Sequence, residues 1–194
     1  MKKVLNVGGN DKRIPLPPQY DGWEHVLLDI DPRGSPDIVC DARELSQLPG
    51  SEYDAIYCSH NLEHYYRHDG EKVLAGFRHV LKKDGFAHIR VPDIAEVMRI
   101  VVERKMDIDD VLYQSALGPI TVLDVLYGYG VEIEQSGNDF FAHKTGFSQK
   151  SLYEMLIRCG FSEVFMNRSN HEIGAFAFLH TPTEFAAKLL NISS

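Results

Sequence analysis

Two adjacent glycines near the N-terminus, together with one acid, have the types and spacing of a binding site for a small ligand. Gly8 and Gly9 follow the apolar run Lys3–Val7, and Asp29 lies at the end of the apolar run His25–Ile30. A glycine has no Cβ, so a ligand can approach its backbone closely. A carboxylate at the position of Asp29 can accept hydrogen bonds from ribose hydroxyls. These residues predict a pocket for a nucleoside-like ligand.

A second acid occupies the equivalent place after the next apolar run. Asp41 follows Asp37–Cys40 and could reach an adenine edge together with the backbone of Ala42. The alternative is that Asp41 caps the segment Arg43–Leu45. The sequence leaves both interpretations open.

A histidine-rich stretch follows a third apolar run. His60-Asn61-Leu62-Glu63-His64 spells H-x-x-E-H, the inverted zinc-protease signature. On a helix, His60 and His64 would face one metal ion, with Glu63 as the base. In that enzyme class the motif lies within a helix, whereas here it directly follows a buried strand. We therefore expect no metal ion at this motif.

The elements that must position these residues alternate between strands and helices. Buried strands are predicted from short apolar runs bounded by Gly, Pro, Asp or Ser, at Lys3–Val7, His25–Ile30, Asp37–Cys40, Tyr53–Cys58 and Phe86–Val91. Helices are predicted to end at Lys82–Gly85, to begin at Asp93 and to run from Ser148 to Gly160. Two antiparallel strands and a terminal helix follow, at Glu163–Asn167, Ala175–Leu179 and Pro182–Leu190. This order predicts an α/β fold with a Rossmann-like mixed sheet, mostly parallel with a C-terminal antiparallel hairpin, and with helices on both faces.

We expect residues 1–194 to form a single domain that carries one long insertion at 106–147. Within it we expect helical pieces near Asp109–Gln114 and Thr121–Leu126, followed by a long loop that contains Tyr127 and Tyr129. Loops of that length in a compact domain are usually lids or binding loops. The insertion is therefore a candidate lid that binds an acceptor molecule.

Composition narrows the class of protein. The formal net charge is −8, from 20 Lys+Arg against 28 Asp+Glu, so nucleic acid is not an expected partner. The chain contains no apolar stretch long enough for a signal peptide or a membrane span. Its cysteines, Cys40, Cys58 and Cys159, show no C-x-x-C spacing and indicate reduced thiols in the cytoplasm. The oligomeric state is left open, and a homodimer is one option.

The missing third glycine separates two classes of ligand. A dinucleotide carries a pyrophosphate, which is best held at a helix N-terminus. Here the G-x-G-x-x-G pattern is incomplete, and the proline-rich run Pro15–Pro18 replaces the expected helix. S-adenosylmethionine (SAM) contains adenosine and an amino acid but no phosphate, so it loses fewer binding contacts when that helix is absent. The sequence therefore favours SAM over NAD.

Six segments in order resemble one family. They are LNVGGN, LLDID, DIVCDARELSQLP, YDAIYCSHNLEHY, VLKKDGFAHIRVPD and FSQKSLYEMLIRCGFSEV. The chain resembles the class I (Rossmann-like) SAM-dependent methyltransferases, in particular a short subgroup that lacks the helix after the first glycine motif. The resemblance implies cofactor contacts at Gly8, Gly9, Asn10, Asp29, Ile30, Asp41, Ala42, Ser59 and His60.

The expected activity is transfer of a methyl group from SAM to an oxygen or nitrogen atom of a small-molecule or sugar-like acceptor. Such a transfer needs alignment, desolvation and, for some acceptors, removal of a proton. His60 is the first candidate for a base, because it lies just past the fourth strand, and His143 in the lid is the second. Tyr127 and Tyr129 could line the acceptor pocket. The alternatives are a non-catalytic SAM-binding module and an NAD-dependent oxidoreductase.

Overall fold

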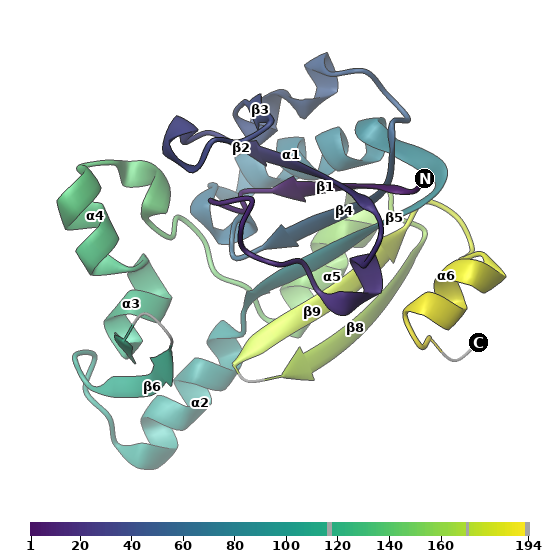
Figure 1. Ribbon diagram of the computed structural model, residues 1–194. Coiled ribbons are helices and arrows are strands. Elements are labelled where there is room, and N and C mark those ends of the chain that lie inside the picture. Colours follow the sequence, from purple (N-terminus) through teal and green to yellow (C-terminus); the bar gives the residue numbers. More distant parts are fainter. Residues whose placement is uncertain (116–117, 170, 193–194) are drawn as a thin grey trace.

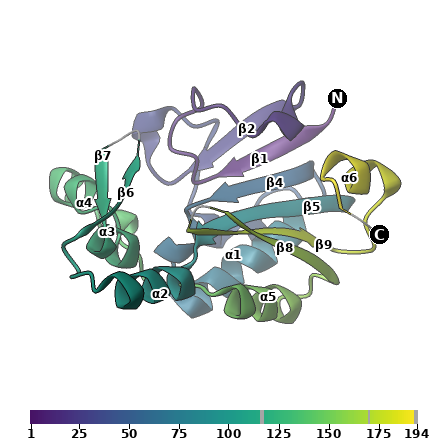
Figure 2. The same ribbon diagram turned by 90° about the horizontal axis from the view of Figure 1, so that it is seen from below.

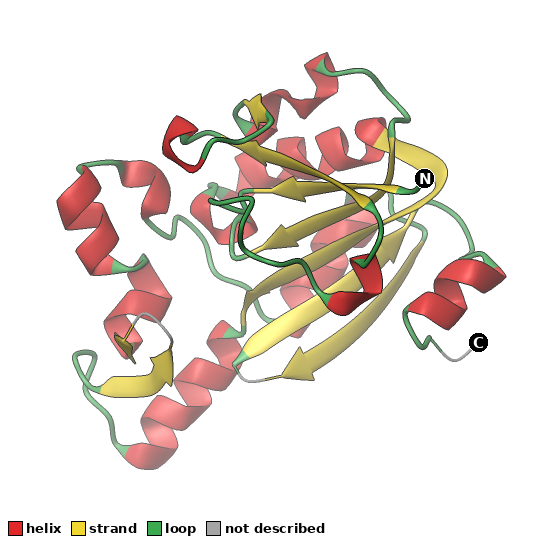
Figure 3. Cartoon of the chain, in the orientation of Figure 1, coloured by secondary structure: helices red, strands yellow, loops and turns green. Residues whose placement is uncertain are grey.

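The computed structural model describes residues 1–115, 118–169 and 171–192, which fold around a seven-stranded sheet (Figures 1 and 3). The strand order is β3-β2-β1-β4-β5-β9-β8. These strands span Ile38–Val39, Glu24–Asp29, Lys3–Val7, Tyr53–Ser59, Leu81–Pro92, Glu172–Phe178 and Glu163–Ser169, respectively. The first five are parallel, and β9 runs antiparallel to both β5 and β8. The predicted mixed sheet with its C-terminal hairpin is confirmed.

The register of the parallel strands brings their carboxyl ends to one edge. Val7 at the end of β1 pairs with Leu28 on one side and with Cys58 on the other. Because the residues that follow these strands emerge at the same edge, the glycine loop after β1 lies beside Asp29 and His60. In open α/β sheets this edge is where ligands bind.

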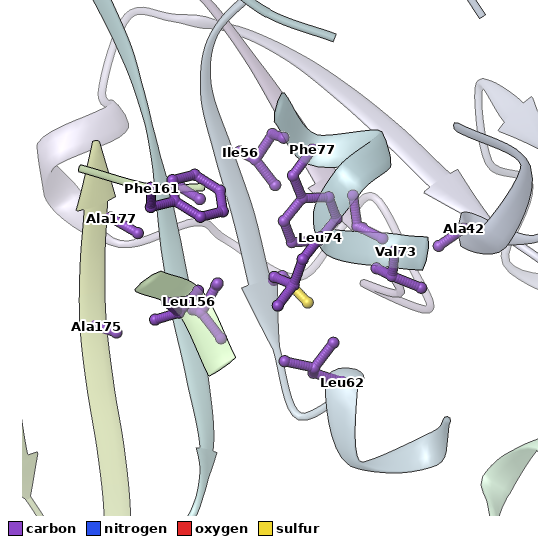
Figure 4. Packing of buried hydrophobic residues seen from close by; sticks show 14 of the residues in the cluster. Ala42, Ile56, Leu62, Val73, Leu74, Phe77, Leu156, Phe161, Ala175 and Ala177 are labelled. Carbon is purple, nitrogen blue, oxygen red and sulfur yellow. The ribbon is translucent and has the colours of Figure 1, made fainter. Parts of the chain in front are cut away.

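One face of the sheet is covered by helices that supply most of the core (Figure 2). They are the α-helices α1 (Arg67–Val80) and α5 (Gln149–Arg158) and the 3-10 helix η3 (Ala42–Gln47). Figure 4 shows Leu74 and Phe77 of α1 and Leu156 of α5 in this cluster, and all three are fully buried. The α1 helix ends at Val80, and Lys82–Gly85 belongs to β5, so the predicted helix end inside that segment was wrong.

The opposite face has a lighter cover. The 3-10 helix η1 (Pro18–Tyr20) and the α-helix α6 (Glu184–Leu189) pack there against a second cluster that includes Phe86 and Phe178. Residues 8–23, all of which the structure describes, contain no α-helix between β1 and β2. As predicted, no α-helix follows the glycines in this segment. Tyr20, only 3% exposed, covers part of the sheet in its place.

The insertion after α2 (Ile94–Arg104) lies to one side of the sheet (Figure 1). It consists of the hairpin β6–β7 and of α3, α4 and the 3-10 helix η5, which span Val111–Ser115, Gly118–Thr121, Val122–Tyr127, Gly130–Ser136 and Asp139–Phe141. The helix predicted near Asp109–Gln114 was wrong, since this segment contributes to β6. The helix predicted near Thr121–Leu126 is confirmed as α3. The loop predicted after it is instead partly helical. Residues 116 and 117 of the insertion lie outside the described residues.

Two further 3-10 helices, η2 (Pro32–Gly34) and η4 (Leu62–His64), follow β2 and β4 at the carboxyl edge. Among the described helices, none is both long and apolar enough to cross a membrane.

Candidate functional site

A cavity of about 500 Å³ lies at the carboxyl edge of the parallel strands. Its walls come from three parts of the chain: the loops after β1, β2 and β3, the segment from His60 to Asp69, and the insertion. Pockets of this size commonly hold a small ligand or cofactor. The fold therefore builds a site where the sequence places its glycines and acids.

The loop after β1 is tied directly to the end of β2. Gly8 has a φ of 71° and its N–H donates to the carbonyl oxygen of Leu28. The backbone N–H groups of Asn10 and Asp31 each donate to the Asp29 carboxylate, at 2.9 Å. A carboxylate offers about four lone-pair sites, so two bonds fix its position and leave others for a ligand. Asp29 is thus a pre-oriented acceptor in the cavity wall.

Asp41 takes the capping role, one of the two that the sequence left open, and it also lines the cavity. Its side chain accepts the Arg43 N–H and so caps η3, and the carboxylate also pairs with the Arg43 guanidinium. Burial opposes ionisation, but the hydrogen bonds from Arg43 outweigh it and lower the pKa of Asp41. Both side chains line the cavity. The cap therefore holds an ionised acid in the cavity wall.

The predicted cofactor residues divide into two groups. Six line the cavity, namely Gly8, Asn10, Asp29, Ile30, Asp41 and His60, and three stand outside its lining, namely Gly9, Ala42 and Ser59. A Cβ on Gly9 would lie 2.1 Å from the Asn6 side chain, so close packing within the protein requires this glycine. Ala42 is buried in the core beneath α1, and Ser59 ends β4.

His60 is held between two acids. Its Nε2 lies 2.8 Å from Glu172 Oε1, and its Nδ1 lies 3.4 Å from Glu63 Oε1. Desolvation opposes protonation, but the hydrogen bond to Glu172 and the proximity of Glu63 outweigh it and raise the pKa of His60 to about 10. An imidazolium has no free lone pair, so this arrangement suits a fixed positive charge better than a base.

Two other histidines meet beside Glu63, although they are far apart in the sequence. The rings of His64 and His143 lie 4.9 Å apart between centroids. His143 reaches this place because the backbone N–H groups of Lys144 and Thr145 donate to the Glu63 carbonyl oxygen. Burial lowers the pKa of His143. His143 was predicted from the sequence, but its pairing with His64 was not.

The insertion supplies the outer wall of the cavity. Asp139, Phe140, Phe141 and Lys144 line it from this side. Arg33, just after β2, links the insertion to the sheet, because its guanidinium pairs with Glu132 of α4 at 3.2 Å. The position of the insertion is therefore coupled to the cofactor side of the cavity.

Several lining residues escaped the sequence analysis. Tyr65 and Tyr66 follow the H-x-x-E-H stretch, and Phe140 and Phe141 precede His143. A pair of aromatic residues beside a histidine was therefore the sequence pattern that could have indicated these lining residues. Tyr127 and Tyr129, proposed for the acceptor pocket, do not belong to the lining, and Tyr127 is exposed.

Comparisons with known proteins agree with this geometry. Residues 20–89 match the family model described as a methyltransferase domain. No curated protein sequence matches the chain. A SAM-dependent methyltransferase from Archaeoglobus fulgidus superimposes with a TM-score of 0.54 at 16% identity, covering 91% of this chain and 85% of that one.

Two further solved structures have the same fold. One is described as a possible histamine N-methyltransferase from Thermotoga maritima, with a TM-score of 0.55, 14% identity and coverage of 93% of this chain and 83% of that one. The other is a Burkholderia thailandensis 1,6-didemethyltoxoflavin N1-methyltransferase with bound substrate and S-adenosylhomocysteine. Its TM-score is 0.52 at 15% identity, and coverage is 91% of this chain and 70% of that one. Residues 20–89 thus resemble a methyltransferase domain, and the chain has the fold of SAM-dependent methyltransferases.

Proposed function

We propose that the protein transfers the methyl group of SAM to an oxygen or nitrogen atom of a small-molecule or sugar-like acceptor. The observation that carries this proposal is the cavity at the carboxyl edge, which has Asp29 fixed in its wall and no helix N-terminus after β1. A nicotinamide dinucleotide would lack its usual pyrophosphate anchor there. Adenosine with a methionine tail needs no such anchor.

In this proposal the cofactor lies along the ends of β1, β2 and β3. Asp29 accepts hydrogen bonds from the ribose hydroxyls, and the backbone at Gly8 lets the ligand approach closely. Asp41 faces the adenine. Asn10 and Ile30 complete this side, and His60 places a positive charge near the end of β4. Gly9, Ala42 and Ser59 then act by shaping the loops that present these groups.

The acceptor is proposed to enter between the cofactor and the insertion, with 106–147 serving as a lid. The wall on that side carries two phenylalanines and Lys144, which suit a partly apolar ligand with polar substituents. The solved toxoflavin-precursor methyltransferase of the same fold holds a small-molecule substrate, which supports a small acceptor for this chain as well. The cavity of about 500 Å³ has the size of pockets that hold small ligands.

The proposed chemistry depends on placement. Methyl transfer from a sulfonium is an in-line displacement: the acceptor atom forms the new bond to the methyl carbon, while the sulfur leaves as a neutral thioether with its electron pair. The protein gains rate by bringing the two atoms into line and excluding water. Phe140, Phe141 and Tyr65 contribute aromatic groups to the cavity wall.

The test is binding of S-adenosylhomocysteine, the demethylated cofactor, followed by thermal unfolding and calorimetry. A ligand that binds only the folded state raises its stability by mass action. We expect a clear rise in Tm for the wild type, at least about a tenfold loss of affinity in Asp29→Ala, from loss of two charge-assisted hydrogen bonds, and no loss in Asp21→Ala. Asp21 is an exposed acid outside the cavity and is the matched control.

Unfolding of the ligand-free variants separates loss of binding from loss of folding, because Asp29 also orders two backbone N–H groups. A Tm rise with NADH and none with S-adenosylhomocysteine would overturn the proposal.

A further inference from the structure

We propose that Glu63, His64 and His143 form a binding site for a divalent first-row transition-metal ion beside the cofactor cavity. Each of the three residues offers one ligand atom, and these atoms lie within 4.8 Å of one another. Among the residues that the structure describes, this is the one such group of three or more histidine, cysteine or acidic side chains. It differs from the H-x-x-E-H pattern in the sequence, because His143 takes the place of His60.

Backbone hydrogen bonds hold the third ligand, His143, near Glu63 although the two residues are 80 positions apart in the sequence. Lys144 and Thr145 donate their N–H groups to the carbonyl oxygen of Glu63, at 2.8 and 3.1 Å. The N–H of His143 donates to the carbonyl oxygen of Tyr127. The first two bonds attach this segment to η4 and the third attaches it to α3, so backbone contacts fix the position of His143 beside Glu63.

Both imidazoles have the orientation that metal-binding histidines require. Nδ1 of His64 lies 3.2 Å from the carbonyl oxygen of Ala142, and Nδ1 of His143 lies 2.9 Å from that of Val125. A carbonyl oxygen can only accept a hydrogen bond, so Nδ1 must carry the proton in each ring. Nε2 is then left with its lone pair. Metal-ligating histidines commonly donate their other ring N–H in this way.

Glu63 points independently to a missing ligand. The residue is only 1% exposed, and neither of its carboxylate oxygens accepts a hydrogen bond from the described residues. His60 Nδ1 stands 3.4 Å from Oε1, which gives an ion pair without the alignment of a hydrogen bond. Buried carboxylates are costly unless their oxygens are satisfied. A cation bound to Glu63 would meet that requirement.

The donor set indicates the class of ion. Imidazole suits zinc, copper, iron and nickel, and two histidines with one carboxylate are typical of sites that keep positions open for water or substrate. Ligand bonds of about 2.1 Å place neighbouring donor atoms roughly 3–3.5 Å apart. Closing the present group therefore needs side-chain shifts of about 1 Å.

The site has a use at the methyl-transfer step, a point that rests on the proposed function. His64 lines the cavity, so an ion bound to it would lie beside the cavity. An ion in this place would orient an acceptor oxygen and favour its deprotonated form.

The test is cobalt binding to tag-free, chelator-treated protein, followed by visible absorption, with zinc as competitor. We expect a saturable one-to-one cobalt spectrum that zinc abolishes. His143→Asn keeps a donor for the Val125 carbonyl but loses the Nε2 ligand, and Glu63→Gln keeps the shape but loses the charge. In both variants the affinity for cobalt should fall at least about tenfold. His68→Asn, which removes an exposed histidine four residues after His64, is the control and should bind as the wild type does.

The outcomes separate this inference from the proposed function. S-adenosylhomocysteine should still raise the Tm of metal-free protein, and loss of that rise would count against the proposed function alone. Absence of a saturable cobalt spectrum at millimolar cobalt would overturn the metal site, as would equal cobalt affinity in the wild type, His143→Asn and Glu63→Gln. Unfolding curves of the variants show whether each one is folded at the temperature of the titration.

Discussion

His88 is a buried histidine that the proposed chemistry does not use, and its environment controls the charge it can carry. It lies in β5 with 6% of its surface exposed, and its Nδ1 is 3.2 Å from the Tyr20 hydroxyl. Its ring packs against Tyr57 and Phe176, with centroids 5.1 and 4.4 Å away. Burial, with a smaller effect of the Arg90 charge, lowers the pKa of His88 to about 3. The folded state therefore keeps this imidazole neutral.

This state predicts the direction of acid destabilisation. Below a pH of about 6.5 the unfolded chain protonates this histidine, whereas the folded state does not until the pH approaches 3. The contribution of the neutral His88 to the free energy of unfolding is thus fully present above about pH 6.5 and is lost as the pH falls toward 3. Replacing His88 by Gln should flatten the decline in free energy of unfolding by up to about 1.4 kcal/mol per pH unit. Urea unfolding of the wild type and the variant at several pH values between 7.5 and 4.5 measures this pH dependence.

The matched control is His180→Gln, which removes an exposed histidine. Its stability should follow the same pH dependence as the wild type. Equal slopes in the two variants would show that His88 is protonated in the folded protein and would contradict the prediction.

At the scale of elements, the conformation of the insertion depends on one glycine, Gly128. Gly128 ends α3 with φ 100° and ψ 160°, a conformation almost restricted to glycine. A Cβ there would lie 2.4 Å from the Phe141 carbonyl oxygen and 3.0 Å from Ala142 Cα. Phe141 lines the cavity, and the next residue but one is His143. A side chain at 128 would therefore push both the wall and the histidine away from the site.

We expect Gly128→Ala to weaken binding of S-adenosylhomocysteine severalfold and to speed proteolysis of the insertion. Gly137→Ala is the comparison, since Gly137 also has a positive φ, of 67°, but has open space around its Cβ position. Its cost should be limited to the roughly 1 kcal/mol of a left-handed alanine. Limited proteolysis and calorimetry distinguish the two variants. Similar behaviour of both would mean that the contact with Phe141 does not position the lid.

The elements also show which parts of the structure were accessible from the sequence. The strand Lys3–Val7 was predicted with its observed bounds, because strands buried on both faces are continuous apolar runs. Asp29 and Asp41 were predicted to share a site because the carboxyl ends of parallel strands lie at one edge of a sheet. The segment Asp109–Gln114 was assigned to a helix, although its valine and tyrosine favour the observed strand and Gly118-Pro119 favours a turn.

The pairing of His143 with His64 was beyond such reasoning. It depends on backbone bonds from Lys144 and Thr145 to Glu63, which join segments about 80 residues apart. No local pattern encodes a contact of that separation. The H-x-x-E-H motif therefore located Glu63 and His64, but it could not indicate that His143 lies beside them.

At the scale of the whole molecule, the chain has separate hydrophobic clusters with separate tasks. The large cluster joins the sheet to α1 and α5 and includes Val73, which is fully buried. A small cluster joins α2 to the insertion and includes Val122, which is 2% exposed. No residue is shared between the two sets. Regions with few buried contacts can open locally without global unfolding, so the lid and the sheet should respond differently to the same loss of packing.

Val73→Ala and Val122→Ala remove the same atoms from these two clusters. Val73→Ala should lower the global free energy of unfolding by about 1–3 kcal/mol, as measured by urea unfolding. Val122→Ala should leave global unfolding nearly unchanged, but should speed hydrogen exchange across residues 122–145 and weaken binding of S-adenosylhomocysteine. The affinity falls because the lid must first order itself, and that ordering subtracts from the binding free energy. If Val122→Ala shifted global unfolding as much as Val73→Ala, the insertion and the sheet would form one cooperative unit. The lid could then not open without unfolding the cofactor site.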